Sequence, residues 1–169
     1  MVSRLGVDPE APTRIDGMVE LWFDDDGAHE AGFSSDVAAR LAVDETLFMQ
    51  GLGGSAVVTD SDAPRAGDAP AAVWLLGYGN VPRRTEIAAE LATMTGVAPE
   101  RVAVNRPVPG AKVLTRPLMK VLPIAGLAVS IAMPSTLEAQ DLATMLARSK
   151  ARSWFPAAQI LIAERIRIV

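Results

Sequence analysis

The sequence contains no cysteine and a single histidine, His29. The first absence excludes disulfide bonds, thiolate metal sites and cysteine nucleophiles. The second excludes a zinc site built from several histidines of one chain, and it leaves His29 as the one histidine for a Ser-His-Asp triad. Aromatic residues make up only 5% of the chain. The core must therefore consist mainly of alanine, valine, leucine and isoleucine.

Long apolar segments are also missing. The longest apolar run covers residues 121–133, contains Pro123 and is too short to span a bilayer. Residues 1–12 lack the apolar centre of a signal peptide. We therefore expect a cytoplasmic protein with no membrane partner.

The net charge of −4 is unevenly divided along the chain. Residues 1–68 hold 14 acidic and 4 basic residues, whereas residues 69–169 hold 6 acidic and 12 basic residues. The two parts, or two chains, could attract each other, or the charges could be dispersed over separate solvated surfaces. The negative total and the lack of a basic aromatic motif argue against nucleic-acid binding.

The pattern of residues 71–169 predicts the element order β-α-β-β-α-β. Strands are expected over 71–79, 100–105, 124–133 and 158–169, and helices over 83–96 and 135–150. We expect Gly96 to end the first helix, and Ser135 with Glu138 to cap the second. This order is that of the split βαβ or ferredoxin-like unit, which indicates an α+β fold.

Residues 1–60 predict a partial copy of the same unit, with the order β-α-β. The expected elements are a strand over 17–23, a short helix over 28–33, a helix over 36–49 capped by Ser34 or Ser35, and a strand over 55–60. Residues 61–70 consist of Ser, Asp, Ala, Pro, Gly and one Arg, which is typical of a linker. The predicted domains are thus 1–60 and 71–169, joined by that linker.

Two stretches of the first part resemble a known family. "DGMVELWFDD" (16–25) followed by "SSDVAARLAVDETLF" (34–48) resembles the EthD-like family of the dimeric α/β-barrel superfamily. Members of that family show an "xELWF" strand and a helix ending in an Asp-Glu-x-x-Phe pattern, which here runs from Asp44 to Phe48. The resemblance is good over residues 16–59 and rests mainly on element order over 70–169.

The resemblance implies a ferredoxin-like dimeric α/β barrel, in which two sheets pack face to face around a cavity. It further implies a homo-oligomer that binds a hydrophobic small molecule and needs no cofactor. The family's usual N-terminal half, which carries a basic strand and a histidine, has no counterpart here. The start of the chain is either truncated relative to its relatives, or the fold is completed in another way.

Glu20 and Trp22 share one face of the predicted strand. The resemblance makes this face the cavity wall, where a carboxylate in apolar surroundings could act as a general acid or base. Glu20 could instead pair with a basic residue across an interface. His29 is the second acid/base candidate, or else an ordinary surface histidine. Asp24, Asp25 and Asp26 lack the spacing of a calcium loop and are interpreted as a solvated turn, so no metal site is expected.

Trp74 and Tyr78 lie on one face of the next predicted strand, where they could pack in the core or stack on a flat ligand. Arg116, in the proline-rich basic segment 106–120, could hold an anionic group or be solvated. Asp44 and Glu45 are interpreted as residues that organise packing and hydrogen bonds rather than chemistry.

The resemblance therefore implies an EthD-like small-molecule-binding protein. It could be a cofactor-independent oxidoreductase or a cyclase-like enzyme that assists an oxidative or polyketide-tailoring reaction on a hydrophobic or aromatic substrate. The alternative is a non-catalytic accessory, ligand-binding or assembly protein, which the missing family histidine favours. Whether the protein is an enzyme stays open from the sequence.

Overall fold

The structure is a computed structural model of the whole chain. It describes residues 2–5, 15–21, 23–55, 57–59, 69–78, 84–111, 113–149 and 159–164. Trp22 and residues 61–68 of the predicted linker lie outside the described residues.

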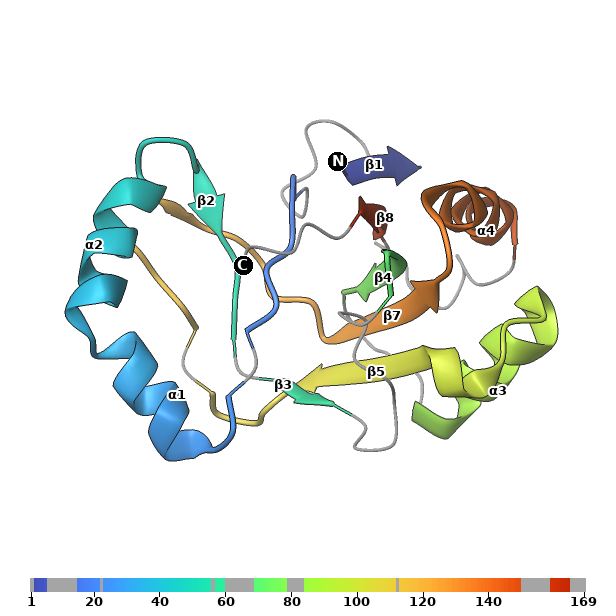
Figure 1. Cartoon of the computed structure of the whole chain (residues 1–169), viewed down its shortest axis with the longest axis horizontal. Helices are drawn as coiled ribbons and strands as arrows, with labels where there is room; N and C mark the ends of the chain where they lie inside the picture. Colours follow the sequence, from blue (N-terminus) through green and yellow to red (C-terminus); the bar gives the residue numbers. More distant parts are fainter. Residues whose placement is uncertain are drawn as a thin grey trace.

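A six-stranded sheet forms the centre of the molecule, in the order β1-β8-β4-β7-β5-β3 (Figure 1). Its strands are β1 (Val2–Leu5), β3 (Val57–Thr59), β4 (Ala71–Gly77), β5 (Val102–Pro107), β7 (Leu127–Met133) and β8 (Gln159–Glu164). Every neighbouring pair in this sheet is antiparallel. β1 was not predicted, because a four-residue segment carries too little alternation to be told from a loop.

Two split βαβ units are interleaved in this sheet. Helix α3 (Arg84–Thr95) joins β4 to β5, and β7 lies between these two strands. Helix α4 (Thr136–Arg148) joins β7 to β8, and β4 lies between them. The element order predicted for residues 71–169 is therefore confirmed, and the α+β architecture is compatible with a ferredoxin-like fold.

Local signals fix the ends of these helices. The Ser135 hydroxyl accepts a hydrogen bond from the backbone N–H of Glu138 at 3.2 Å, as predicted for the start of α4. Gly96 follows the last residue of α3 with φ of +69°, a left-handed conformation that glycine adopts without steric cost. Both predicted helix boundaries are confirmed to within two residues.

One face of the sheet is covered by α3 and α4 through a purely aliphatic core. Ala71, Val73 and Leu75 of β4 point to this side, because alternate residues of a strand share a face. They pack with side chains of both helices, among them Ile87, Leu91, Ala139, Leu142 and Leu146. Burial of this set supplies much of the free energy of folding, since apolar area removed from water is stabilising.

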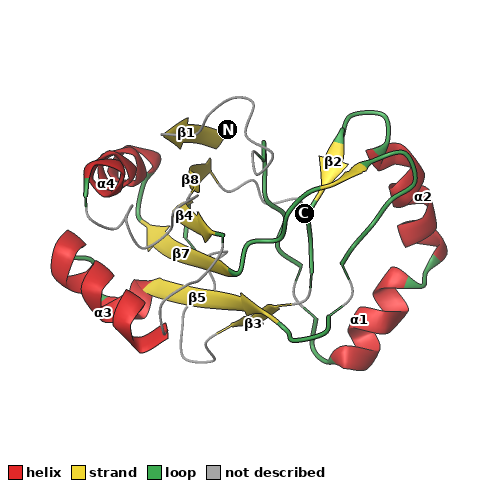
Figure 2. Ribbon diagram, turned by 180° about the vertical axis from the view of Figure 1, so that it is seen from behind, coloured by secondary structure: helices red, strands yellow, loops and turns green. Residues whose placement is uncertain are grey.

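Residues 23–55 form a separate layer. Helix α1 (Asp26–Phe33) and helix α2 (Asp36–Glu45) follow each other directly, and β2 (Gly51–Leu52) pairs in parallel with β6 (Lys120–Val121). α1 and α2 lie at one end of the molecule and α3 and α4 at the other, with the large sheet between them (Figures 1 and 2). Ser35 caps α2 by accepting from the backbone N–H of Ala38 at 3.1 Å, as predicted.

The strand predicted over residues 17–23 is wrong. Within the described residues of that range the backbone is irregular and pairs with no strand. Its apolar residues are used differently from those of a strand: Met18 packs on the sheet, while Val19 and Leu21 are exposed. A strand needs a hydrogen-bonded neighbour, and the two flanks of β4 are already occupied by β7 and β8.

The expected partial βαβ copy is therefore incomplete in the structure. Its first strand is absent from the described residues, and its last strand, β3, joins β5 at an edge of the large sheet. Asp25, expected in a solvated turn, is exposed and also caps α1, accepting from the backbone N–H of Ala28 at 2.7 Å. None of the helices in the described parts of the chain has the length and apolar character needed to cross a bilayer.

Candidate binding face

The second face of the sheet differs in chemistry from the one under α3 and α4. Ala72, Trp74 and Leu76 of β4 and Leu161 of β8 form a second buried cluster there. Loop residues rather than a helix pack on it, namely Ile15, Met18 and Ala125. We call it the loop-covered face.

Three polar residues are buried on the loop-covered face. Strand register sets Ser130 opposite Trp74, Gln159 opposite Leu76, and Asn105 opposite Ala128. Residues opposite each other in an antiparallel pair project to the same side of the sheet. Asn105, Ser130 and Gln159 are 5%, 2% and 1% exposed, and they are the buried polar residues among those the structure describes.

Two of these polar side chains have identified hydrogen bonds. Asn105 Nδ2 donates to the carbonyl oxygen of Ala128 at 3.0 Å, and Gln159 Oε1 accepts from the backbone N–H of Ile15 at 3.4 Å. The Ser130 hydroxyl makes no hydrogen bond to any residue that the structure describes. A buried hydroxyl without a partner costs free energy, so a water molecule or a ligand atom beside it would be stabilising.

Tyr78 extends the aromatic character of the loop-covered face. It follows β4 and packs, half-buried, against the cluster around Trp74. Burial raises the pKa of the Tyr78 phenol above its usual 10.0. The phenol is therefore protonated at neutral pH and can donate a hydrogen bond.

The structure brings together two of the predicted site residues, Trp74 and Tyr78. Glu20 is exposed on the irregular segment, two residues after Met18. Both the polar set and the aromatic rings of the loop-covered face are uncharged at neutral pH. That face can therefore bind by stacking and neutral hydrogen bonds, and the acid/base role of Glu20 stays a prediction.

His29 lies on α1 in a small exposed aromatic cluster. Its ring centroid is 5.0 Å from that of Phe23 and 4.9 Å from that of Phe33. These contacts hold α1 against the segment that precedes it, which gives His29 a role in packing. Its role as a proton carrier stays a prediction.

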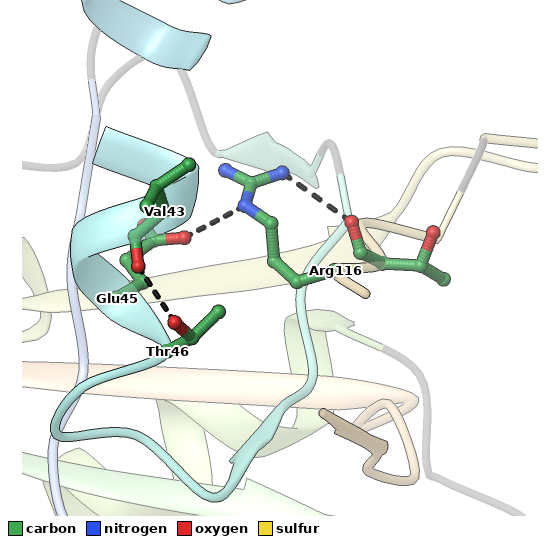
Figure 3. Close-up of polar contacts among 5 residues, drawn as sticks. Val43, Glu45, Thr46 and Arg116 are labelled. Atoms are coloured by element: carbon green, nitrogen blue, oxygen red, sulfur yellow. Dashed lines mark hydrogen bonds and ion pairs between the residues drawn. The ribbon is translucent and has the colours of Figure 1, made fainter. Parts of the chain in front are cut away.

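Arg116 is engaged by an acidic residue rather than directed to an open anion site. Its Nε donates to Glu45 Oε2 at 2.7 Å, and its Nη1 donates to the carbonyl oxygen of Thr115 at 3.4 Å (Figure 3). The side chains of Arg116 and Glu45 are only 13% and 15% exposed. The ion pair joins α2 to a loop 71 residues away in sequence. This contact is of the kind expected for Glu45 as an organising residue, and the absence of a chemical role for Asp44 and Glu45 stays a prediction.

Breaking the Glu45–Arg116 pair is expected to loosen α2. We expect Glu45→Gln and Arg116→Met each to lower the free energy of unfolding by about 1–3 kcal/mol, because each leaves a mostly buried charge without its partner. The double variant should cost less than the sum of the two, since neither charge is then left alone. Urea unfolding measures the cycle, and faster hydrogen exchange should be confined to α1 and α2. Additive losses would show that the contact contributes nothing.

The other surfaces of the described residues are weaker candidates for a binding site. A shallow, open hollow on α4 is lined by Asp141, Thr144, Met145, Arg148 and Ser149. Within the described ranges, no three acidic or histidine side chains come close enough to hold a metal ion. The loop-covered face therefore remains the best-built candidate site.

Sequence reasoning missed Asn105, Ser130 and Gln159. Ser130 is the single polar residue of β7, whereas Asn105 is followed by Arg106 in β5 and Gln159 opens β8, which ends at Glu164. Their gathering on one face depends on strand order and register, which the pattern of one strand does not contain.

No protein-family model matches this sequence, and comparison with curated proteins and with solved structures returns no match. What the fold and the site define together is an α+β protein with two split βαβ units and a buried, uncharged, partly aromatic sheet face.

Proposed function

We propose that this protein binds a small, neutral, aromatic molecule against the loop-covered face. The observation that carries the proposal is the buried Ser130 hydroxyl, which has no hydrogen-bond partner among the described residues and lies opposite Trp74. Ligand sites commonly combine an aromatic wall with a few well-placed polar groups. Trp74 supplies the wall, and Ser130 and Tyr78 supply hydroxyls.

Small side chains surround these groups. Ala72, Ala128 and Ala163 belong to or pack on the same cluster. Their side chains are short, so they rise less far from the sheet than the Trp74 ring beside them. Residues 15–18 cover this cluster. A ligand would therefore replace the contacts of Ile15 and Met18 and displace this segment, which forms no regular secondary structure.

The arrangement of layers supports a barrel-like reading of the fold. We infer that the loop-covered face corresponds to the cavity wall of an EthD-like barrel, with residues 15–21 and the β2–β6 pair as an incomplete second layer. α1 and α2 stand outside that layer, as α3 and α4 stand outside the sheet (Figure 1). The predicted homo-oligomer and the domain limits of 1–60 and 71–169 remain parts of this proposal.

Two functions fit such a site. One is a cofactor-independent enzyme that assists an oxidative or polyketide-tailoring reaction, with Glu20 as acid or base once residues 15–21 close over a ligand. The other is a non-catalytic accessory or ligand-binding protein. The uncharged side chains of Asn105, Ser130 and Tyr78 favour the second, because none of them takes up a proton at neutral pH.

Thermal-shift measurement with a panel of neutral and anionic aromatic compounds tests the proposal. We expect neutral compounds to raise the melting temperature with concentration, by the equivalent of about 2.7 kcal/mol at a hundredfold excess over Kd. Ser130→Ala should weaken the shift, and Ser34→Ala, an exposed serine on α1's end, should not. If no compound shifts the melting temperature, or Ser130→Ala leaves the shift intact, the site assignment is wrong.

Substitution of Glu20 distinguishes the enzyme from the non-catalytic binding protein. Once a bound compound is converted by the wild type, Glu20→Gln should abolish turnover while leaving the thermal shift unchanged. Equal turnover in both proteins removes Glu20 from the mechanism.

A further inference from the structure

Helix α2 presents its larger apolar side chains to solvent. Its half-buried residues are Ala38, Ala42 and Glu45, the last held by Arg116. No residue of the helix is buried. A helix on a globular surface normally turns its large apolar residues inward, so the reverse arrangement indicates a second contact on the outer side.

The outer side forms one continuous row. Val37, Leu41, Leu47 and Phe48 are 63%, 50%, 80% and 69% exposed. The helical turn continues past α2, since Phe48 N–H donates to the carbonyl oxygen of Glu45 at 3.3 Å. With Arg40 and Asp44, these residues follow the spacing of a helix-packing surface. We call the six residues the α2 stripe.

The charges of the α2 stripe complement each other only in one arrangement. Arg40 and Asp44 are both exposed, and neither has an ion-pair partner among the described residues. In an antiparallel pair of α2 helices, the register that sets Arg40 opposite Asp44 of the second copy also sets Asp44 opposite Arg40. The same register places Val37 opposite Leu47. A parallel pair would set each charge against its own kind.

We propose that two copies of this chain associate through the α2 stripe, antiparallel about a two-fold axis. A stripe of one sign would repel a second copy and call for a basic or acidic partner, whereas a stripe carrying both signs is complementary to itself. The interface is independent of the loop-covered face, so it stands whether or not that face binds a ligand. A single helix offers less than the roughly 800 Å² per partner of a standard interface, so the dimer is expected to be reversible.

Sedimentation velocity over a concentration series tests the dimer with the full chain. We expect Leu41→Asp to raise the dimer dissociation constant at least about tenfold, since it places a charge in the apolar row. Leu137→Asp is the matched control, because Leu137 is likewise an exposed leucine, 69% exposed on α4. Circular dichroism confirms that both variants are folded, which is expected for substitutions at exposed positions.

Exchanging the charges of Arg40 and Asp44 tests the antiparallel arrangement itself. Arg40→Asp and Asp44→Arg should each weaken the dimer about tenfold, because like charges then face each other. The double exchange should restore it. A wild type that is monomeric at every concentration, a dimer that Leu41→Asp leaves intact, or a double exchange that fails to restore association would each overturn the proposal. Association of the wild type with a different protein only would do so as well.

Discussion

Replacing Trp74 with alanine is expected to lower the free energy of unfolding by about 3–5 kcal/mol, the largest loss among the substitutions considered. Trp74 is the largest side chain of the cluster on the loop-covered face, on which Ile15 and Met18 of the covering segment pack. Its removal leaves a cavity between β4, β7 and residues 15–18, which cannot close completely because the strands are fixed by their hydrogen bonds.

Urea unfolding followed by circular dichroism measures this loss, and Leu118→Ala is the control, because the Leu118 side chain is 100% exposed. Trp74→Phe should recover part of the stability by filling part of the cavity. If Trp74→Ala costs less than about 1 kcal/mol, the loop-covered face is not packed as described, and its use as a binding site must be reconsidered.

The elements of residues 71–169 could be predicted because each carries a complete local signal. β4 is a continuous apolar run, β7 is apolar except for Ser130, α4 begins at a capping serine, and α3 ends at a glycine in the left-handed region. Once these elements are known, the right-handed preference of βαβ crossovers and the apolar face of α4 leave few ways to assemble them. The antiparallel order of β8, β4, β7 and β5 follows from that.

The chain start could not be predicted in the same way. Residues 17–23 have the apolar character of a strand, but a strand also depends on a free neighbour in the sheet, which lies far away in sequence. The two edges of the sheet are formed by β1 and β3 instead. The local pattern predicts a strand over 55–60, where β3 lies, but not its place at the edge, and it does not predict β1, which is only four residues long.

The residues of the site could be predicted only in part, and for a related reason. Trp74 lies in β4 and Tyr78 directly follows this strand, so the alternation of an extended chain places both side chains on one face. Arg116 was assigned to a ligand, but its partner Glu45 comes from α2, and a contact across 71 residues is set by the tertiary fold. The acidic first part and the basic second part of the chain do meet in this ion pair.

Gln159 provides the second large effect, and it tests the layer that covers the site. We expect Gln159→Ala to lower the free energy of unfolding by about 2–4 kcal/mol, because a side chain that is 1% exposed leaves a cavity and the backbone N–H of Ile15 loses its acceptor. Gln159→Leu keeps the volume and removes the polar contacts of the amide, including the acceptor for Ile15, so its cost should be smaller, about 1–2 kcal/mol.

The two variants should differ in where the structure opens. In Gln159→Leu the large sheet stays intact, and faster hydrogen exchange should be confined to residues 15–21, whose irregular backbone depends on contacts with the sheet. A neutral aromatic ligand should then bind more tightly, because less free energy is needed to displace the covering segment. Uniformly faster exchange throughout the sheet would instead assign Gln159 to the core. Slower exchange of residues 15–21 in this variant would contradict the displacement of this segment by which a ligand enters.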